Sequence, residues 1–126
     1  MAQIAFKELS HQVLRAVLVH NILGPGLLES TYEQSLVIEL QRRGIPVFRQ
    51  KVYPLYYKGE LAGAYIADLV VDNRIILEFK SVRQLTCVME AQLINYLRLS
   101  KVSVGYLINF CNTKVQWRRF VQTGDG

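Results

Sequence analysis

The fold of this chain is decided by two apolar runs around a short polar turn, Tyr65-Ile-Ala-Asp68-Leu-Val-Val-Asp72-Asn73-Arg-Ile-Ile-Leu-Glu78-Phe-Lys80. Apolar runs of this length, bounded by turn residues, predict the two strands of a hairpin. Residues two apart on a strand project from the same face, so Glu78 and Lys80 point the same way. Because burying an unpaired charge is costly, charges inside apolar strands indicate a site with a chemical role. An Asp, a Glu and a Lys at one sheet edge suit metal-assisted hydrolysis of a phosphodiester bond.

The loop of this hairpin determines whether Asp68 and Glu78 share a face. Directly opposed residues on antiparallel strands point to the same face. A two-residue turn at Asp72-Asn73 would put Asp68 opposite Leu77 and turn Glu78 to the other side. A three-residue loop, for instance with Asn73 in a left-handed conformation, brings the two carboxylates together. We therefore predict a loop of odd length.

Length and composition indicate one globular domain over residues 1–126. A chain of 126 residues suits a single core, and 51% hydrophobic with 20% charged residues excludes a disordered chain. No apolar run reaches the roughly 18 residues of a membrane span, and the first residues lack the layout of a secretory signal. We therefore expect a cytoplasmic protein without a membrane partner, in which the isolated Cys87 and Cys111 are buried free thiols.

The chain is basic, with a net charge of +5 and a pI near 9.4. This charge favours a polyanionic partner such as nucleic acid, although many basic domains bind none. The basic residues fall at the ends of predicted elements, so the sequence defines no continuous groove.

Hydrophobic periodicity and turn residues predict three helices and five strands in the order ααβββαββ. This order predicts an α/β fold with a mixed central sheet flanked by helices. An N-terminal helix over about 6–21 precedes a core over about 27–121. The core elements are expected at 27–43 (helix, stopped by Gly44), 47–57, 65–71, 75–81, 88–99 (helix), 102–110 and 115–121.

Asp68, Glu78 and Lys80 form the first candidate group. Mg²⁺ takes oxygen ligands and keeps several waters, so two carboxylates and the backbone carbonyl of Phe79 make a suitable set. Such an ion would lower the pKa of a bound water and offset charge on the phosphate. Lys80 would position or help deprotonate that water, or stabilise the transition state as a cation. The alternative is a solvated edge strand whose Glu and Lys only face water.

Two helical groups extend this site. Glu29, Tyr32 and Glu33 are spaced i, i+3, i+4 and share a helix face. Either the helix dipole alone accounts for the two acids, or one of them is a third metal ligand. Gln92 and Tyr96 are spaced i, i+4 on the helix after the Lys80 strand, where they would orient water or contact phosphate and base. The alternative is a helix whose Gln and Tyr border the core.

Together these groups resemble the PD-(D/E)xK nuclease superfamily and, more closely, the small bacterial GxxExxY family within it. Gly26-Leu-Leu-Glu-Ser-Thr-Tyr32 matches the motif that names the family. Asp68, followed by Glu78-Phe-Lys80, matches the metal-and-lysine core of the superfamily. Gln92 with Tyr96 matches the Gln-x-x-x-Tyr motif of the RecB-like branch. The similarity covers nearly the whole chain.

The match to the superfamily departs at one position and is ambiguous at another. Ala67 stands where a Pro usually precedes the first Asp. Glu29 fits the family signature, whereas Glu33 stands at the distance before Gly44 that small resolvase-like members favour. We favour Glu33 as the acid closer to the metal.

The resemblance implies a nuclease dependent on Mg²⁺ or Mn²⁺ that acts on DNA, with RNA as the alternative substrate. Asp68 and Glu78 would bind metal, while Lys80, Gln92 and Tyr96 would complete the catalytic set. One alternative is a nuclease-like module that binds nucleic acid or protein without cutting. Another is a subunit that is active only with a protein partner or a second copy of itself.

Overall fold

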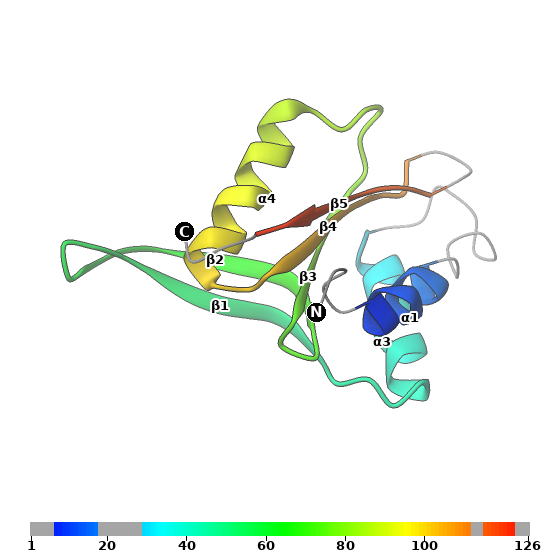
Figure 1. The fold of residues 1–126 in the computed structure, drawn as a ribbon. Helices are drawn as coiled ribbons and strands as arrows, with labels where there is room; N and C mark the ends of the chain where they lie inside the picture. Colours follow the sequence, from blue (N-terminus) through cyan, green and yellow to red (C-terminus); the bar gives the residue numbers. More distant parts are fainter. Residues whose placement is uncertain (1–6, 18–28, 112–114, 123–126) are drawn as a thin grey trace.

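A five-stranded mixed sheet forms the centre of the molecule, with helices against both faces (Figure 1). The structure is a computed structural model that describes residues 7–17, 29–111 and 115–122. The strands lie side by side in chain order, and only the β3–β4 pair is parallel. The described elements are α1 (Lys7–Val17), α3 (Glu29–Arg42), β1 (Val47–Tyr57), β2 (Glu60–Val71), β3 (Ile75–Lys80), α4 (Cys87–Ser100), β4 (Val104–Asn109) and β5 (Gln116–Val121). The predicted α/β fold is confirmed.

Local sequence signals determine where α3 ends and where α4 begins. Gly44, with φ of +74°, follows α3, and the Ile45 N–H donates to the Leu40 carbonyl at 3.0 Å, a glycine-terminated helix end. The Thr86 hydroxyl accepts from the Met89 N–H at 3.3 Å and caps α4. Residues 18–21 of the first predicted helix and residues 27–28 of the second lie outside the described residues.

The hairpin of β1 and β2 is longer than predicted and projects past the helices (Figure 1). β2 begins at Glu60, five residues before the predicted start at Tyr65. Residues 60–64 carry Gly and Ala, which have little strand propensity of their own. Residues 60–64 are in a strand because they pair with β1. Their conformation therefore depends on a neighbouring strand and not on their own propensity.

The β2–β3 loop has three residues, as predicted. Val71 pairs with Ile75, which leaves residues 72–74 as the loop. Asp72 and Asn73 are both left-handed, with φ of 53° and 56°. Continuing the register from the pair Leu69↔Leu77 sets Asp68 opposite Glu78.

The core has two layers, one on each face of the sheet. On one face Tyr32, Leu36 and Leu40 of α3 are buried against residues that include Leu77 and Tyr106. These residues recur every four positions, so α3 turns one apolar face to the sheet.

On the other face, Leu93 and Leu97 of α4 are buried over β3 and β4. A Cβ on Gly105 would lie 3.1 Å from Leu97 Cδ2 and 3.2 Å from Leu93 Cδ1, so glycine permits the close approach of α4 to β4. This approach brings the helix that carries Gln92 and Tyr96 onto the sheet.

The prediction of buried cysteines is wrong. Both thiols are free, but Cys87 and Cys111 are exposed. Cys87 is the first residue of α4, and Cys111 follows the end of β4, so both lie outside the packed layers. No helix in the described ranges is both long and apolar enough to cross a membrane.

A buried amide holds the chain directly after the Lys80 strand. Asn109 is 1% exposed, and its Nδ2 donates to the Val82 carbonyl at 2.8 Å. Its Oδ1 accepts from the N–H groups of Val82 at 3.1 Å and Cys111 at 3.2 Å. One side chain therefore satisfies backbone groups on two segments at this end of the sheet.

We expect Asn109→Ala to lower the free energy of unfolding by about 1–3 kcal/mol, because it leaves buried backbone groups of Val82 without partners. Urea denaturation of the two proteins measures this difference. Asn95→Ala is the matched control, since exposed Asn95 bonds to Arg98 on the surface of α4 and to no other side chain in the described part of the protein. Equal losses for both substitutions would contradict the role assigned to Asn109.

Candidate functional site

The candidate site forms where β2 and β3 separate. Leu69↔Leu77 is the last backbone pair of these strands on the side of Asp68. Beyond it, the Phe79 N–H donates to Asp68 Oδ2 at 2.8 Å. The Asp68 side chain thus takes the position of a backbone acceptor in the ladder, which fixes its carboxylate beside Glu78.

Glu78 is held by two donors on one of its oxygens. Its Oε2 accepts from the Tyr65 hydroxyl and from the Asp68 N–H, the latter at 3.4 Å. Within the described ranges, Oε1 of Glu78 and Oδ1 of Asp68 accept no hydrogen bond. Each carboxylate therefore keeps one oxygen available, and hard divalent cations prefer such oxygen ligands. The donor set fits Mg²⁺ or Mn²⁺.

The two carboxylates also repel each other. Burial raises the pKa of Glu78 from 4.5 to about 7, and the negative charge of Asp68 acts in the same direction. Hydrogen bonds from Tyr65 and the Asp68 backbone, and the charge of Lys80, partly oppose this increase. Burial raises the pKa of Tyr65 as well, as do the nearby carboxylates, so its hydroxyl remains a donor. A cation between the carboxylates would relieve their repulsion.

Helix α4 completes the cavity beside these carboxylates. Glu78 and Lys80 project from β3 toward α4, where Gln92 and Tyr96 lie. All four line one small cavity together with Met89, Leu93 and Leu107. The structure therefore brings together two strand residues and two helix residues predicted from separate motifs.

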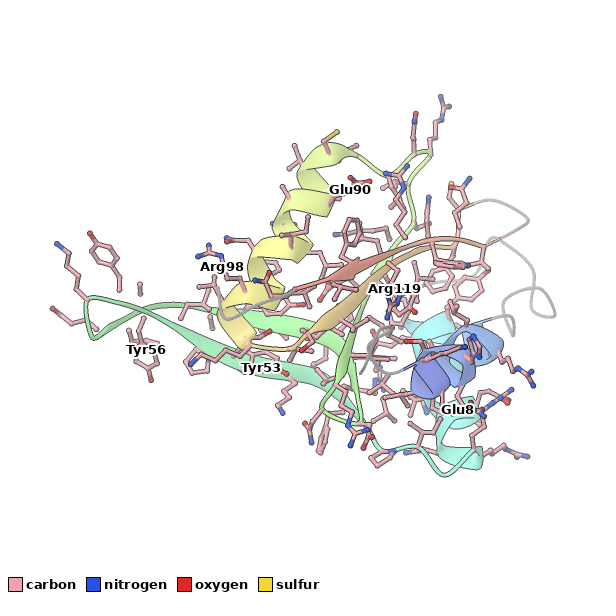
Figure 2. The ribbon with its side chains drawn as sticks, in the orientation of Figure 1. Glu8, Tyr53, Tyr56, Glu90, Arg98 and Arg119 are labelled. Carbon is pink, nitrogen blue, oxygen red and sulfur yellow. The ribbon has the colours of Figure 1, made fainter. Side chains whose placement is uncertain are left out.

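An aromatic stack supports this cavity from the hairpin side. The Tyr65 ring stacks on Tyr96 with centroids 3.8 Å apart, and Tyr53 of β1 stacks on Tyr65 at 5.9 Å. Figure 2 marks Tyr53 near the base of the projecting hairpin. The stack links three elements and orients the hydroxyl that holds Glu78.

Tyr65 is a site residue that sequence reasoning missed. Strict strand alternation puts Tyr65 and Asp68 on opposite faces, which gives no reason to group them. Gln50, opposite Asp68 in the β1–β2 register, has φ of 52°. The alternation of β2 itself breaks near Asp68, because Tyr65, Ala67 and Val70 all pack in the layer beneath α4. No residue pattern identifies this break beforehand.

The third acid is not brought to the pair. Glu33 is buried, and its Oε2 accepts from Arg49 Nε at 2.8 Å. Among residues 7–17, 29–111 and 115–122, no three His, Cys, Asp or Glu side chains group closely enough to hold a metal. Glu29 is the first residue of α3, and its side chain lies outside the described part. The choice between these two acids stays a prediction.

The raised pKa of Glu78 predicts a pH-dependent stability that Glu78→Gln removes. The folded state holds this proton more tightly than the unfolded state, so the stabilisation is complete below about pH 4.5 and lost as pH rises through about 7. Urea unfolding in a metal-free buffer from about pH 5 to about pH 7.5 should show wild type losing stability relative to Glu78→Gln. Glu39→Gln, on the surface of α3, should retain the wild-type profile. Parallel curves for wild type and Glu78→Gln would refute the prediction.

Comparison with known proteins agrees with this fold. The crystal structure of SSO0001 superposes with a TM-score of 0.53 at 18% identity, over 76% of this chain and 50% of that chain. The chain thus spans about half the length of that protein, with which it shares a fold. The comparison with curated proteins gives no match. The family model described as PD-(D/E)XK nuclease superfamily matches residues 7–120, and the chain therefore belongs to the PD-(D/E)XK nuclease superfamily.

Proposed function

We propose that this protein is a nuclease that hydrolyses phosphodiester bonds of DNA, or alternatively RNA, with Mg²⁺ or Mn²⁺. One observation carries the proposal: the Asp68 and Glu78 carboxylates face each other beside Lys80. Membership of a nuclease superfamily supports the same function.

The metal would be held by Asp68 Oδ1 and Glu78 Oε1, with the Phe79 carbonyl as the predicted third ligand. When bound, it supplies a Lewis acid that offsets phosphate charge and lowers the pKa of water. Tyr65 and the Asp68 N–H keep Glu78 turned toward Asp68. Because Glu78 must be ionised to act as a ligand, metal binding releases its proton near neutral pH.

The remaining residues act on water and phosphate. In hydrolysis, water attacks phosphorus, one P–O ester bond breaks, and the leaving oxygen receives a proton. The Lys80 ammonium stabilises the added negative charge or orients the attacking water. Gln92, which lines the same cavity, holds water or a phosphate oxygen through its amide. Tyr96 contacts the substrate from the wall that it shares with Tyr65.

A third acid would come from α3. Glu33 reaches the metal only if it leaves Arg49, so we infer that Arg49 governs the availability of this ligand. Glu29 is the alternative, since it lies in the Gly26–Tyr32 motif. That motif and the Gln92–Tyr96 pair support assignment to the GxxExxY family and the RecB-like branch. We also infer a single domain over residues 1–126 and a cytoplasmic location.

Lys80→Ala should abolish cleavage, with a loss of at least about 10²-fold, because it removes a charge that acts on the transition state. The assay incubates single-stranded, duplex and branched DNA, and RNA, with Mg²⁺ or Mn²⁺. Asp68→Asn should behave in the same way.

Lys7→Ala is the control for this assay, because Lys7 is an exposed lysine at the start of α1. It should cut at the wild-type rate. Cleavage that survives in Lys80→Ala would refute the mechanism, and a matching loss in Lys7→Ala would point to a general effect of charge.

A binding module that does not cut is the second candidate. The pairing of Glu33 with Arg49 favours it, because the described side chains then leave two carboxylates at the site. A nuclease that needs a protein partner, or a second copy, would behave similarly when assayed alone.

Metal-dependent stabilisation separates these candidates. Millimolar Mg²⁺ or Mn²⁺ should raise the melting temperature of wild type, since binding to the folded state stabilises it. Asp68→Asn should lose this rise, whereas Glu39→Gln should keep it. Stabilisation without cleavage would favour the partner-dependent enzyme, and the absence of any metal response would favour the binding module.

A further inference from the structure

A second cavity lies between β5 and the segment that joins β3 to α4. Its volume is about 510 Å³, within the roughly 300–1,000 Å³ typical of ligand pockets. None of the predicted site residues lines it. We call it the arginine cavity; its lining residues are Arg83, Gln84, Leu85, Gln116, Trp117 and Arg118.

Two β5 residues of the arginine cavity, Gln116 and Arg118, point to the same face of the sheet as Lys80. Lys80 is the partner of Asn109 on β4, and Asn109 is the partner of Gln116 on β5. Laterally adjacent partners point to one face, which is the face that α4 covers. Two strand spacings separate Lys80 from Gln116, which is roughly 10 Å.

The polar groups of the arginine cavity suit an anion. Exposed Arg83 pairs with no carboxylate in the part of the chain that the structure describes. Arg118 pairs with Glu90, which projects from α4 on the side of the β3–α4 connection (Figure 2). The described charged groups at the cavity are therefore two guanidinium groups and one carboxylate. The amides of Gln84 and Gln116 add neutral donors, and guanidinium groups bind phosphate oxygens in a fork.

We propose that the arginine cavity binds a backbone phosphate of the nucleic acid strand whose cleaved bond lies at Lys80. This inference rests on the proposed nuclease function. At about 3.4 Å per nucleotide along a duplex strand, a separation of roughly 10 Å sets this phosphate within about three nucleotides of the cleaved bond. Lys80 and the arginine cavity thus hold two points of one strand and fix its direction across the sheet.

Binding of a fluorescein-labelled DNA oligonucleotide, followed by anisotropy in EDTA, tests the cavity without cleavage. Arg83→Gln should weaken binding about tenfold, because it removes a charged hydrogen bond to phosphate. It should also reduce the slope of log K against log salt by about 0.7–0.9. Glu90→Gln should strengthen binding, because it frees Arg118 and removes a repelling charge. Arg42→Gln, at the end of α3 on the opposite face, is the matched control and should change little.

Cleavage kinetics give a second readout. Arg83→Gln should raise KM for the oligonucleotide but leave hydrolysis of thymidine 5′-monophosphate p-nitrophenyl ester unchanged, because that ester has no second phosphodiester. If Arg83→Gln binds DNA with the same affinity as Arg42→Gln, the proposal is overturned. Inorganic phosphate that binds through Arg83, without any effect of Arg83→Gln on DNA binding, would also overturn it in favour of a free-phosphate site. If wild type shows neither cleavage nor stabilisation by metal, but Arg83→Gln still weakens DNA binding, the nuclease proposal fails and the arginine cavity stands.

Discussion

The site depends on the separation of β2 from β3 at Asp68. While two strands pair, their backbone groups satisfy each other and side chains stand above or below the sheet. Where β2 and β3 part, the Phe79 N–H needs another acceptor, and the Asp68 carboxylate provides it. The same separation lets the Asp68 N–H reach Glu78. Two acids are therefore held together by backbone donors, against their own repulsion.

Helix α4 supplies the opposite wall, and its closeness to the sheet is a packing result. Gly105 has no side chain, so Leu93 and Leu97 can rest directly on β4. This contact sets the height of Gln92 above β3. It also allows Tyr96 to stack on Tyr65, which in turn donates to the carboxylate of Glu78. The packing of the core and the polarity of the site are thus parts of one arrangement.

Charge is distributed unequally across this face of the sheet. The acids lie near its centre, where a cation would neutralise them. Near β5 lie Arg118, which pairs with Glu90, and Arg83, which pairs with no carboxylate among the described residues. A polyanionic strand would meet an unfavourable field at the centre and a favourable one at the margin. A metal ion at the acids and the arginines near β5 would therefore both favour binding of a polyanionic strand. The Glu33–Arg49 pair adds a third feature, an ion pair that joins α3 to β1 and holds this acid away from the two carboxylates.

Local sequence alone determined the order of elements, the strand face of Glu78 and Lys80 and the stop at Gly44. Each follows from periodicity of two or 3.6 residues, or from turn residues that permit a left-handed conformation. The odd-length loop after Val71 was predicted from the hypothesis that Asp68 and Glu78 share one face. Long-range contacts decided the rest. Pairing with β1 extended β2 back to Glu60, and a break in the alternation of β2 near Asp68 placed Tyr65 on the face of Glu78. The sequence could not reveal these features, because they depend on how strands pair and helices pack. A local residue pattern contains no information on those contacts.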